Sequence, residues 1–232
     1  MSNKSSQGPI ALWRAYLRSD KAKEELRGNW VMALAYRAPG VVVSALCLRL
    51  GIRANTVTMT GALMALSLPV VAVVLPPVAA AWAVCLLGVC AIVLDCVDGD
   101  IARSTATASP FGARLDFLVD MALWGLLYGA IGIVADRLHD GGWGWTALAI
   151  AAAWARVLAR LYNDHAGGAA TTQFHPWTPV RVAEAFVAGL SGAIPLLAVA
   201  VIAAPWTVWL LVAYSAADLI DATRRLLRAP AP

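Results

Sequence analysis

The sequence predicts an all-α integral membrane protein, with six transmembrane helices preceded by an N-terminal amphipathic interfacial helix. Of the 232 residues, 60% are hydrophobic and only 14% are charged, whereas a soluble domain is about 45–50% apolar and about 25% charged. A water-soluble chain of this length could not bury so much apolar surface in one core. Residues 56–78 and 185–217 contain no charged residue, and about 20 apolar residues cross a bilayer as a helix.

The N-terminal region has helical periodicity from Pro9 to Tyr36. Ile10, Trp13 and Leu17 recur on one face, and basic residues supply another face. This pattern is typical of a helix that lies in the headgroup region, although a soluble helix packed on the protein's own loops is the alternative. We expect Pro39-Gly40 to end this helix.

Two parts of the chain follow from this pattern. Residues 1–54 are expected to form a cytosolic or interfacial segment, and residues 55–228 the membrane domain. The uncharged run 185–217 would make a helix of roughly 50 Å at about 1.5 Å per residue, too long for a hydrocarbon core of about 30 Å. We therefore divide it at Ala204-Pro205. The six predicted spans are about 56–78, 79–101, 113–135, 143–161, 182–204 and 205–222.

The distribution of charge predicts the orientation. With six spans, every lysine and arginine except Arg137 falls on one side of the membrane. Because positive residues stay in the cytosol, both termini are expected to face the cytosol of a cell (inner) membrane. Five spans would instead place Arg224, Arg225 and Arg228 outside. The net charge of +4 is then explained by the basic residues on the cytosolic side of the membrane. We therefore expect no nucleic-acid partner.

Several other classes are excluded. The four cysteines lie in apolar stretches or beside a carboxylate, and the three histidines are scattered, which argues against a disulfide scaffold and a zinc site. The first 30 residues carry many charges and no long apolar core, so we expect no cleavable signal peptide.

Four aspartates lie where the second predicted span ends and the third begins. These signature aspartates are Asp95, Asp98, Asp116 and Asp120. The first two are spaced i, i+3 and the last two i, i+4, so each pair shares one helix face. A short loop joins the two helices, so the two faces can point at each other at the cytosolic end.

Such a cluster indicates metal chemistry. Four carboxylates at the membrane edge repel one another and lose solvation. A divalent cation relieves that cost, and hard oxygen ligands favour Mg²⁺ or Mn²⁺. Mg²⁺ in turn indicates a phosphate-bearing substrate. The alternative is that the aspartates cap helices or pair with nearby arginines.

The intervening residues suit the same chemistry. Gly99 and Gly112 remove side chains where a substrate or a facing backbone comes close, and Ala102 keeps the same space open. Arg103 supplies a planar fork that fits phosphate oxygens.

Residues 95–120 read D-x2-D-G-x2-A-R-x8-G-x3-D-x3-D. This resembles the signature of the CDP-alcohol phosphotransferases (CDP-alcohol phosphatidyltransferases), with every fixed position present. The resemblance implies an integral membrane enzyme, usually a homodimer among membrane lipids, that takes a CDP-linked lipid donor and a small alcohol acceptor. An acceptor hydroxyl attacks the phosphorus distal to cytidine, and CMP leaves.

The resemblance also implies roles for individual residues. The signature aspartates would hold the metal, and Asp120 would also accept the proton. Many members have a segment P-N/D-x-x-T, and residues 54–58 here read A-N-T-V-T, without the proline. The alternative role of Asn55 is purely structural, as a helix cap. The implied contacts with the CDP donor are Asn55, Thr58, Asp98, Gly99, Ala102, Arg103, Ser109 and Gly112.

Three arginines are candidates for the acceptor site. Arg156 and Arg160 are spaced i, i+4 near the cytosolic end of the fourth span, and Arg181 opens the fifth. Their guanidinium groups could surround a phosphorylated acceptor such as inositol phosphate or glycerol phosphate. The alternative is that they anchor the helices by snorkelling.

Two other functions compete with this hypothesis. Intramembrane prenyltransferases also use Mg²⁺ and aspartate-rich motifs, but their motifs typically lie on well-separated helices. A small cation channel or transporter needs acidic residues at mid-membrane or in rings along a pore, whereas these gather at one end.

Overall fold

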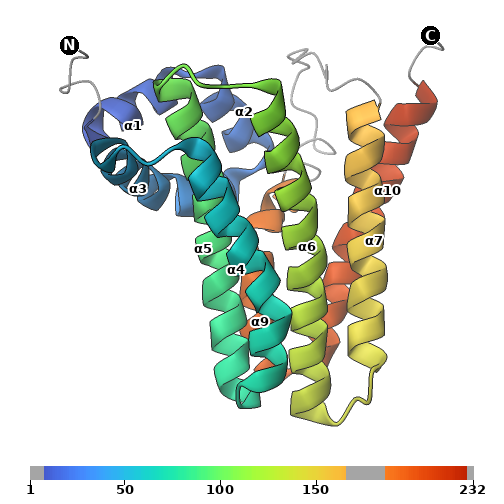
Figure 1. The fold of residues 1–232 in the computed structure, drawn as a ribbon. Helices are drawn as coiled ribbons and strands as arrows, with labels where there is room; N and C mark the ends of the chain where they lie inside the picture. The colour runs from blue at the N-terminus through green and yellow to red at the C-terminus, as the bar shows by residue number, and fades with distance from the viewer. Residues whose placement is uncertain (1–7, 166–185, 229–232) are drawn as a thin grey trace. The chain divides into compact units, whose positions relative to one another are not determined.

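The computed structural model describes residues 8–165 and 186–228, and within those ranges it contains helices and no strand (Figure 1). The expected all-α fold of an integral membrane protein is therefore confirmed. From residue 54 onward the α-helices include α4 (Ala54–Val74), α5 (Pro77–Ser104), α6 (Pro110–His139), α7 (Gly144–His165), α9 (Leu197–Ala203) and α10 (Val208–Arg228).

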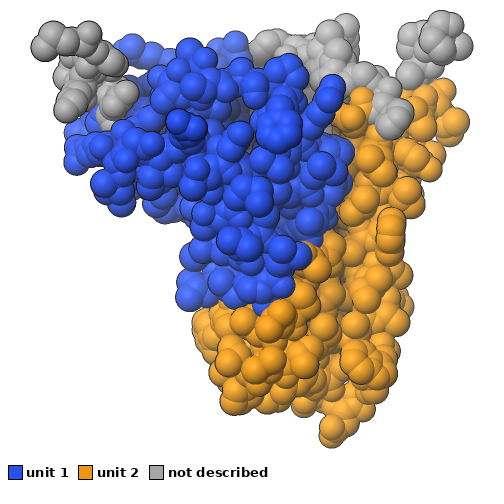
Figure 2. Space-filling view, viewed as in Figure 1, with its two compact units in different colours: residues 1–67, 86–123, 184–195 blue, residues 68–85, 124–183, 196–232 orange. Residues whose placement is uncertain are grey.

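The chain divides into two compact units, coloured separately in Figure 2. Unit 1 comprises residues 1–67, 86–123 and 184–195, and unit 2 comprises residues 68–85, 124–183 and 196–232. Helices α4, α5 and α6 therefore each begin in one unit and end in the other. The predicted division into residues 1–54 and 55–228 stays a prediction.

The N-terminal helix is interrupted where the sequence predicted one continuous helix. Helix α1 (Pro9–Arg18) and helix α2 (Asp20–Gly28) are separated by Ser19, whose backbone is extended. The hydroxyl of Ser19 accepts a hydrogen bond from the backbone N–H of Ala22 at 3.2 Å, so this serine caps α2. The local preference of serine for a cap outweighs the continuous helical periodicity.

The expected break at Pro39-Gly40 is wrong. Helix α3 (Arg37–Leu50) contains both residues and follows a π-helical turn, η2 (Met32–Tyr36). The π-helical turn directly before α3, with its i→i+5 hydrogen bonds, shifts the hydrogen-bond pattern just ahead of Pro39, so the helical run 32–50 continues through the proline. A Cβ atom on Gly40 would lie 3.4 Å from the Cβ of Cys96, so this glycine permits close packing of α3 against α5.

Helices α3, α4 and α5 meet in one apolar cluster of unit 1. Its buried members are Cys47, Val57, Val97 and Ile101. Between helices in a membrane, such contacts stabilise through close van der Waals packing rather than through removal of water. This cluster holds the start of α4 against the part of α5 that carries Asp95 and Asp98.

Five helical segments in the described part of the chain are long and apolar enough to cross a membrane. They are residues 32–50, 54–74, 77–104, 110–139 and 186–203. Helices α7 and α10, which pack side by side within unit 2 (Figure 1), fall outside this set, and both carry charged residues. The number of six spans stays a prediction.

The helix boundaries follow the sequence closely. The structure begins α4, α5, α6 and α7 within three residues of the predicted starts. The predicted division at Ala204-Pro205 is also confirmed, because Ala204 is extended and a short 3-10 turn, η4 (Pro205–Thr207), precedes α10.

Arg137, the exception to the charge asymmetry, has a structural partner. Its guanidinium donates to the backbone oxygens of Ala72 at 2.5 Å and Leu75 at 2.7 Å, at the end of α4. The last carbonyls of a helix lack intrahelical partners and attract cations. Arg137 therefore caps α4.

Asp136 caps the start of α7 from the neighbouring helix α6. The buried carboxylate accepts hydrogen bonds from the backbone N–H groups of Trp145 at 3.1 Å and Thr146 at 2.8 Å, and from the Thr146 hydroxyl at 2.6 Å. This carboxylate thus satisfies two N–H groups that the first turn of a helix leaves free.

Replacing Asp136 by alanine should destabilise the protein by about 1–3 kcal/mol, because buried donors lose their acceptor. The melting temperature of the detergent-solubilised protein measures the effect. The control is Asp164→Ala, because Asp164 is exposed near the other end of α7. Equal melting temperatures for the two variants would contradict the capping role.

Candidate active site

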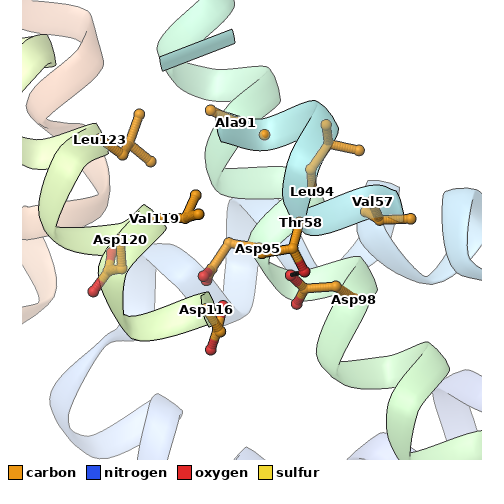
Figure 3. A pocket seen from close by; sticks show the side chains of 11 residues that line it. Val57, Thr58, Ala91, Leu94, Asp95, Asp98, Asp116, Val119, Asp120 and Leu123 are labelled. Atoms are coloured by element: carbon orange, nitrogen blue, oxygen red, sulfur yellow. Dashed lines mark hydrogen bonds between the residues drawn. The ribbon is translucent and has the colours of Figure 1, made fainter. Parts of the chain in front are cut away.

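The four signature aspartates line one pocket within unit 1. Helix α5 contributes Asp95 and Asp98, and helix α6 contributes Asp116 and Asp120; Figure 3 shows these side chains around the same space. The sequence therefore correctly predicted that the two acidic faces meet. The complete lining is Val57, Thr58, Gly61, Ala91, Leu94, Asp95, Asp98, Asp116, Val119, Asp120 and Leu123.

Local structure explains how α6 begins opposite α5. The hydroxyl of Ser109 accepts a hydrogen bond from the backbone N–H of Gly112 at 3.1 Å, which makes Ser109 the N-cap of α6, and Pro110 fills the first helical position. A five-residue connection, residues 105–109, separates the two helices. The chain therefore reverses direction within a few residues, and the two acidic pairs face each other.

Thr58 connects the first turn of α4 to this pocket. Its hydroxyl donates to the carboxylate of Asp98 at 2.6 Å, the hydrogen bond drawn in Figure 3. Both side chains are buried, with exposed fractions of 6% for Thr58 and 5% for Asp98. The hydrogen bond fixes the orientation of the Asp98 carboxylate where it lines the pocket.

The pocket concentrates negative charge. Asp95 lies close enough to the other three signature aspartates for their charges to repel its own. Carboxylate oxygens are the donors that Mg²⁺ and Mn²⁺ prefer, so the residues fit a divalent cation chemically. Across the described ranges, however, no three histidine, cysteine or acidic side chains are arranged so that they could hold a metal as they stand.

Three of the predicted donor contacts lie together at the start of α6. A Cβ atom on Gly112 would lie 3.3 Å from the hydroxyl oxygen of Ser109 and 3.5 Å from the amide oxygen of Asn55. Asn55 is exposed at the start of α4, and Ser109 is exposed before α6. Glycine at position 112 thus leaves both polar side chains close to the helix backbone.

The predicted phosphate contact, Arg103, lies over Gly99. A Cβ atom at position 99 would lie 3.0 Å from the nearest guanidinium nitrogen, so glycine lets the guanidinium fold over the helix. Arg103 also donates to the carboxylate of Asp100 at 2.6 Å, and its side chain is 51% exposed. Ala102, next to it, is partly buried.

Sequence reasoning missed the residues behind Arg103. The side chain of Asp100 is only 14% exposed, and its carboxylate also accepts a hydrogen bond from Arg37 at 3.3 Å. Arg37 in turn is paired with Glu25. One signal was present in the sequence, because a charged residue at the start of an apolar helix requires a partner.

The predicted acceptor arginines belong to unit 2, apart from Arg181, which lies outside the described residues. Arg156 lies over the rings of Trp124, at 4.3 Å, and Tyr214, at 4.9 Å. Its guanidinium is 3.5 Å from the carboxylate of Asp218, and Arg160 is exposed. The acceptor role of the three arginines stays a prediction.

These features define a class of helical membrane proteins in which two adjoining helices supply an acidic, cation-compatible pocket. The family model of the CDP-alcohol phosphatidyltransferases matches residues 51–217. The chain belongs to this family, as the signature predicted. A comparison with curated proteins gives no match. Membership supports a transferase that moves a phospho-alcohol group from a CDP-alcohol to an alcohol acceptor.

Proposed function

We propose that the protein transfers a phosphatidyl or related phospho-alcohol group from a CDP-linked donor, such as CDP-diacylglycerol, to an alcohol and releases CMP. Phosphorylated alcohols such as inositol phosphate or glycerol phosphate are the acceptor class that the arginines favour. The product would be a phospholipid or a phospholipid precursor. The observation that carries this proposal is the pocket itself, which combines all four signature aspartates with Thr58.

The proposed cofactor is Mg²⁺, with Mn²⁺ as the alternative. The signature aspartates would hold it, because their oxygens line one pocket and repel one another without a counter-charge. When bound there, the cation offsets the negative charge of the diphosphate during the transfer.

The chain's own residues have distinct roles in the proposed reaction. Arg103 binds phosphate oxygens of the donor, and Asn55, Gly99, Ala102, Ser109 and Gly112 shape the space that the CDP group enters. Asp120 accepts the proton of the acceptor hydroxyl while the hydroxyl oxygen attacks the phosphorus distal to cytidine. The bond between that phosphorus and the bridging oxygen breaks, and the electron pair leaves with CMP.

The same proposal covers the cellular setting. The enzyme would be a homodimer in the cell (inner) membrane, with both termini and the pocket on the cytosolic side. The support is that the signature spans the connection between α5 and α6, which is flanked by Arg103 and Arg114, together with the charge asymmetry.

The decisive experiment uses the purified protein with Mg²⁺ and CDP-diacylglycerol, screened against candidate alcohols while CMP is measured. We expect CMP release that depends on an acceptor and stops when EDTA removes the cation. Turnover of a prenyl diphosphate, or cation flux in liposomes without CMP, would contradict the proposal.

Thr58→Val should lower the rate of CMP release roughly tenfold or more. Valine has the same shape but cannot donate, so the buried Asp98 carboxylate loses a hydrogen bond worth about 1–3 kcal/mol. Thr58→Ser, which keeps the hydroxyl, is the matched control. Equal rates for the valine and serine variants would show that this hydrogen bond does not orient Asp98 for the reaction.

A further inference from the structure

A chain of charged side chains links the N-terminal helices to the signature. Glu25 on α2 accepts a bidentate interaction from Arg37 on α3, through Nε at 2.8 Å and through Nη2. The third nitrogen of the same guanidinium, Nη1, lies 3.3 Å from Asp100, whose same oxygen accepts from Arg103 at 2.6 Å. All of these residues belong to unit 1.

This series of charged side chains begins outside the region that defines the family. Glu25 and Arg37 precede residue 51, where the family match starts, and Asp100 and Arg103 lie inside the signature. The N-terminal helices therefore contact the donor-binding motif directly through side chains.

The interior of this chain is closed to solvent. Arg37 is 2% exposed and the side chain of Glu25 is 10% exposed. Tyr16 donates to Glu25 at 2.9 Å, and Arg37 also lies over the Tyr16 ring at 5.1 Å. Burial alone would raise the pKa of Glu25, but the hydrogen bonds from Arg37 hold that pKa below its usual range. Glu25 therefore stays ionised and keeps Arg37 in place.

Stability alone does not explain such a chain. Replacing a buried ion pair by well-packed apolar residues is often neutral or stabilising, because the pair loses solvation. A buried pair that fixes the position of a third group has a further use. Here the third group is Asp100, which contacts the half-exposed side chain of Arg103 at the edge of the donor site.

We propose that Arg37, held by Glu25, is a positioning residue for the donor site, because it fixes Asp100 and thereby orients the Arg103 guanidinium toward the donor diphosphate. This inference rests on the proposed function and adds the N-terminal helices to the donor-binding apparatus. An arginine that is already oriented loses less side-chain entropy when it binds phosphate.

Basic and acidic groups from α2, α3 and α5 gather at one end of the signature. Lys21 on α2 lies 3.8 Å from Glu25, and burial, together with the nearby charges of Arg37 and Arg103, lowers the pKa of Lys21. Lys21, Arg37 and Arg103 therefore lie near one another, with Glu25 and Asp100 as their ion-pair partners.

The test measures equilibrium binding of CDP, in Mg²⁺, to the full-length protein. The main variant is Glu25→Gln with Arg37→Gln, which removes both buried charges at once and leaves no lone buried ion. We expect this pair to weaken CDP binding about 5- to 10-fold, and Arg103→Gln alone to weaken it at least as much. When Arg103→Gln is already present, adding the pair should change binding less than about twofold, because the pair acts through Arg103.

The matched control is Asp20→Asn with Lys23→Gln. These residues form an exposed ion pair at 2.9 Å on the same helix α2. The control therefore removes one negative and one positive charge from α2 and leaves the contacts among Glu25, Arg37, Asp100 and Arg103 unchanged. Its CDP affinity should equal that of the wild type. Arg37→Lys is a milder variant, because an ammonium group cannot contact both carboxylates as the guanidinium does; it should weaken CDP binding by an intermediate factor.

Two results would overturn the inference. One is unchanged CDP affinity in the paired variant and in Arg37→Lys. The other is a loss of affinity that is equally large with and without Arg103→Gln, which would indicate a general structural role. A wild-type protein that binds no CDP at all would instead refute the proposed function itself.

Discussion

Asp120→Asn should reduce CMP release by about 10²–10⁴-fold, the range by which a positioned general base accelerates proton transfer. Asparagine has nearly the same shape as aspartate and keeps an oxygen that faces the pocket. It cannot accept the proton of the acceptor hydroxyl. The side chain lies in the acidic pocket with the other signature aspartates, so the loss follows from chemistry rather than from a displaced helix.

The control for Asp120→Asn separates the proton acceptor from the metal ligands. CDP binding in Mg²⁺ should stay within a few-fold of the wild type, because three carboxylates remain. Asp164→Asn, an exposed carboxylate on α7, should leave both measurements unchanged. Turnover by Asp120→Asn within tenfold of the wild type would show that another group accepts the proton.

The fold could be predicted from the sequence wherever local pattern determines it. The apolar runs defined α4, α5 and α6, and Ala204-Pro205 marked a real break, because an extended residue and a proline end α9. The expectation failed at Pro39-Gly40. A sequence pattern does not show that a π-helical turn precedes the proline, nor that a glycine is needed for a close contact with Cys96.

In the candidate site, too, some residues could be predicted from the sequence and others could not. The acidic pairs could be predicted because each pair lies on one helix and a short connection joins the two helices. The partners of Arg103 could not be predicted in full. Asp100 is three residues away on the same helix, whereas Arg37 comes from α3 and is 63 residues from Asp100. Such a contact depends on how the helices pack, which residue spacing does not reveal.

Arg156→Ala together with Arg160→Ala should raise the KM for a phosphorylated acceptor roughly 10- to 100-fold, because hydrogen bonds to charged groups contribute about 1.5–3 kcal/mol. The turnover number and the KM for the CDP donor should change little, since these arginines would bind the acceptor and not the reacting atoms. In the structure Arg156 is largely buried, and its Nε has no hydrogen-bond partner among the described residues.

Asp218 provides the matched variant for this prediction. If Arg156 serves only as the partner of Asp218, then Asp218→Asn should affect the enzyme as Arg156→Ala does. If Arg156 binds the acceptor, Asp218→Asn frees the guanidinium and should leave the acceptor KM unchanged or lower it. Arg225→Gln, which breaks an exposed pair with Asp221, tests for a general effect of lost positive charge. An unchanged acceptor KM in the double arginine variant would favour anchoring of the helix, because a snorkelling side chain contributes to orientation and not to substrate binding.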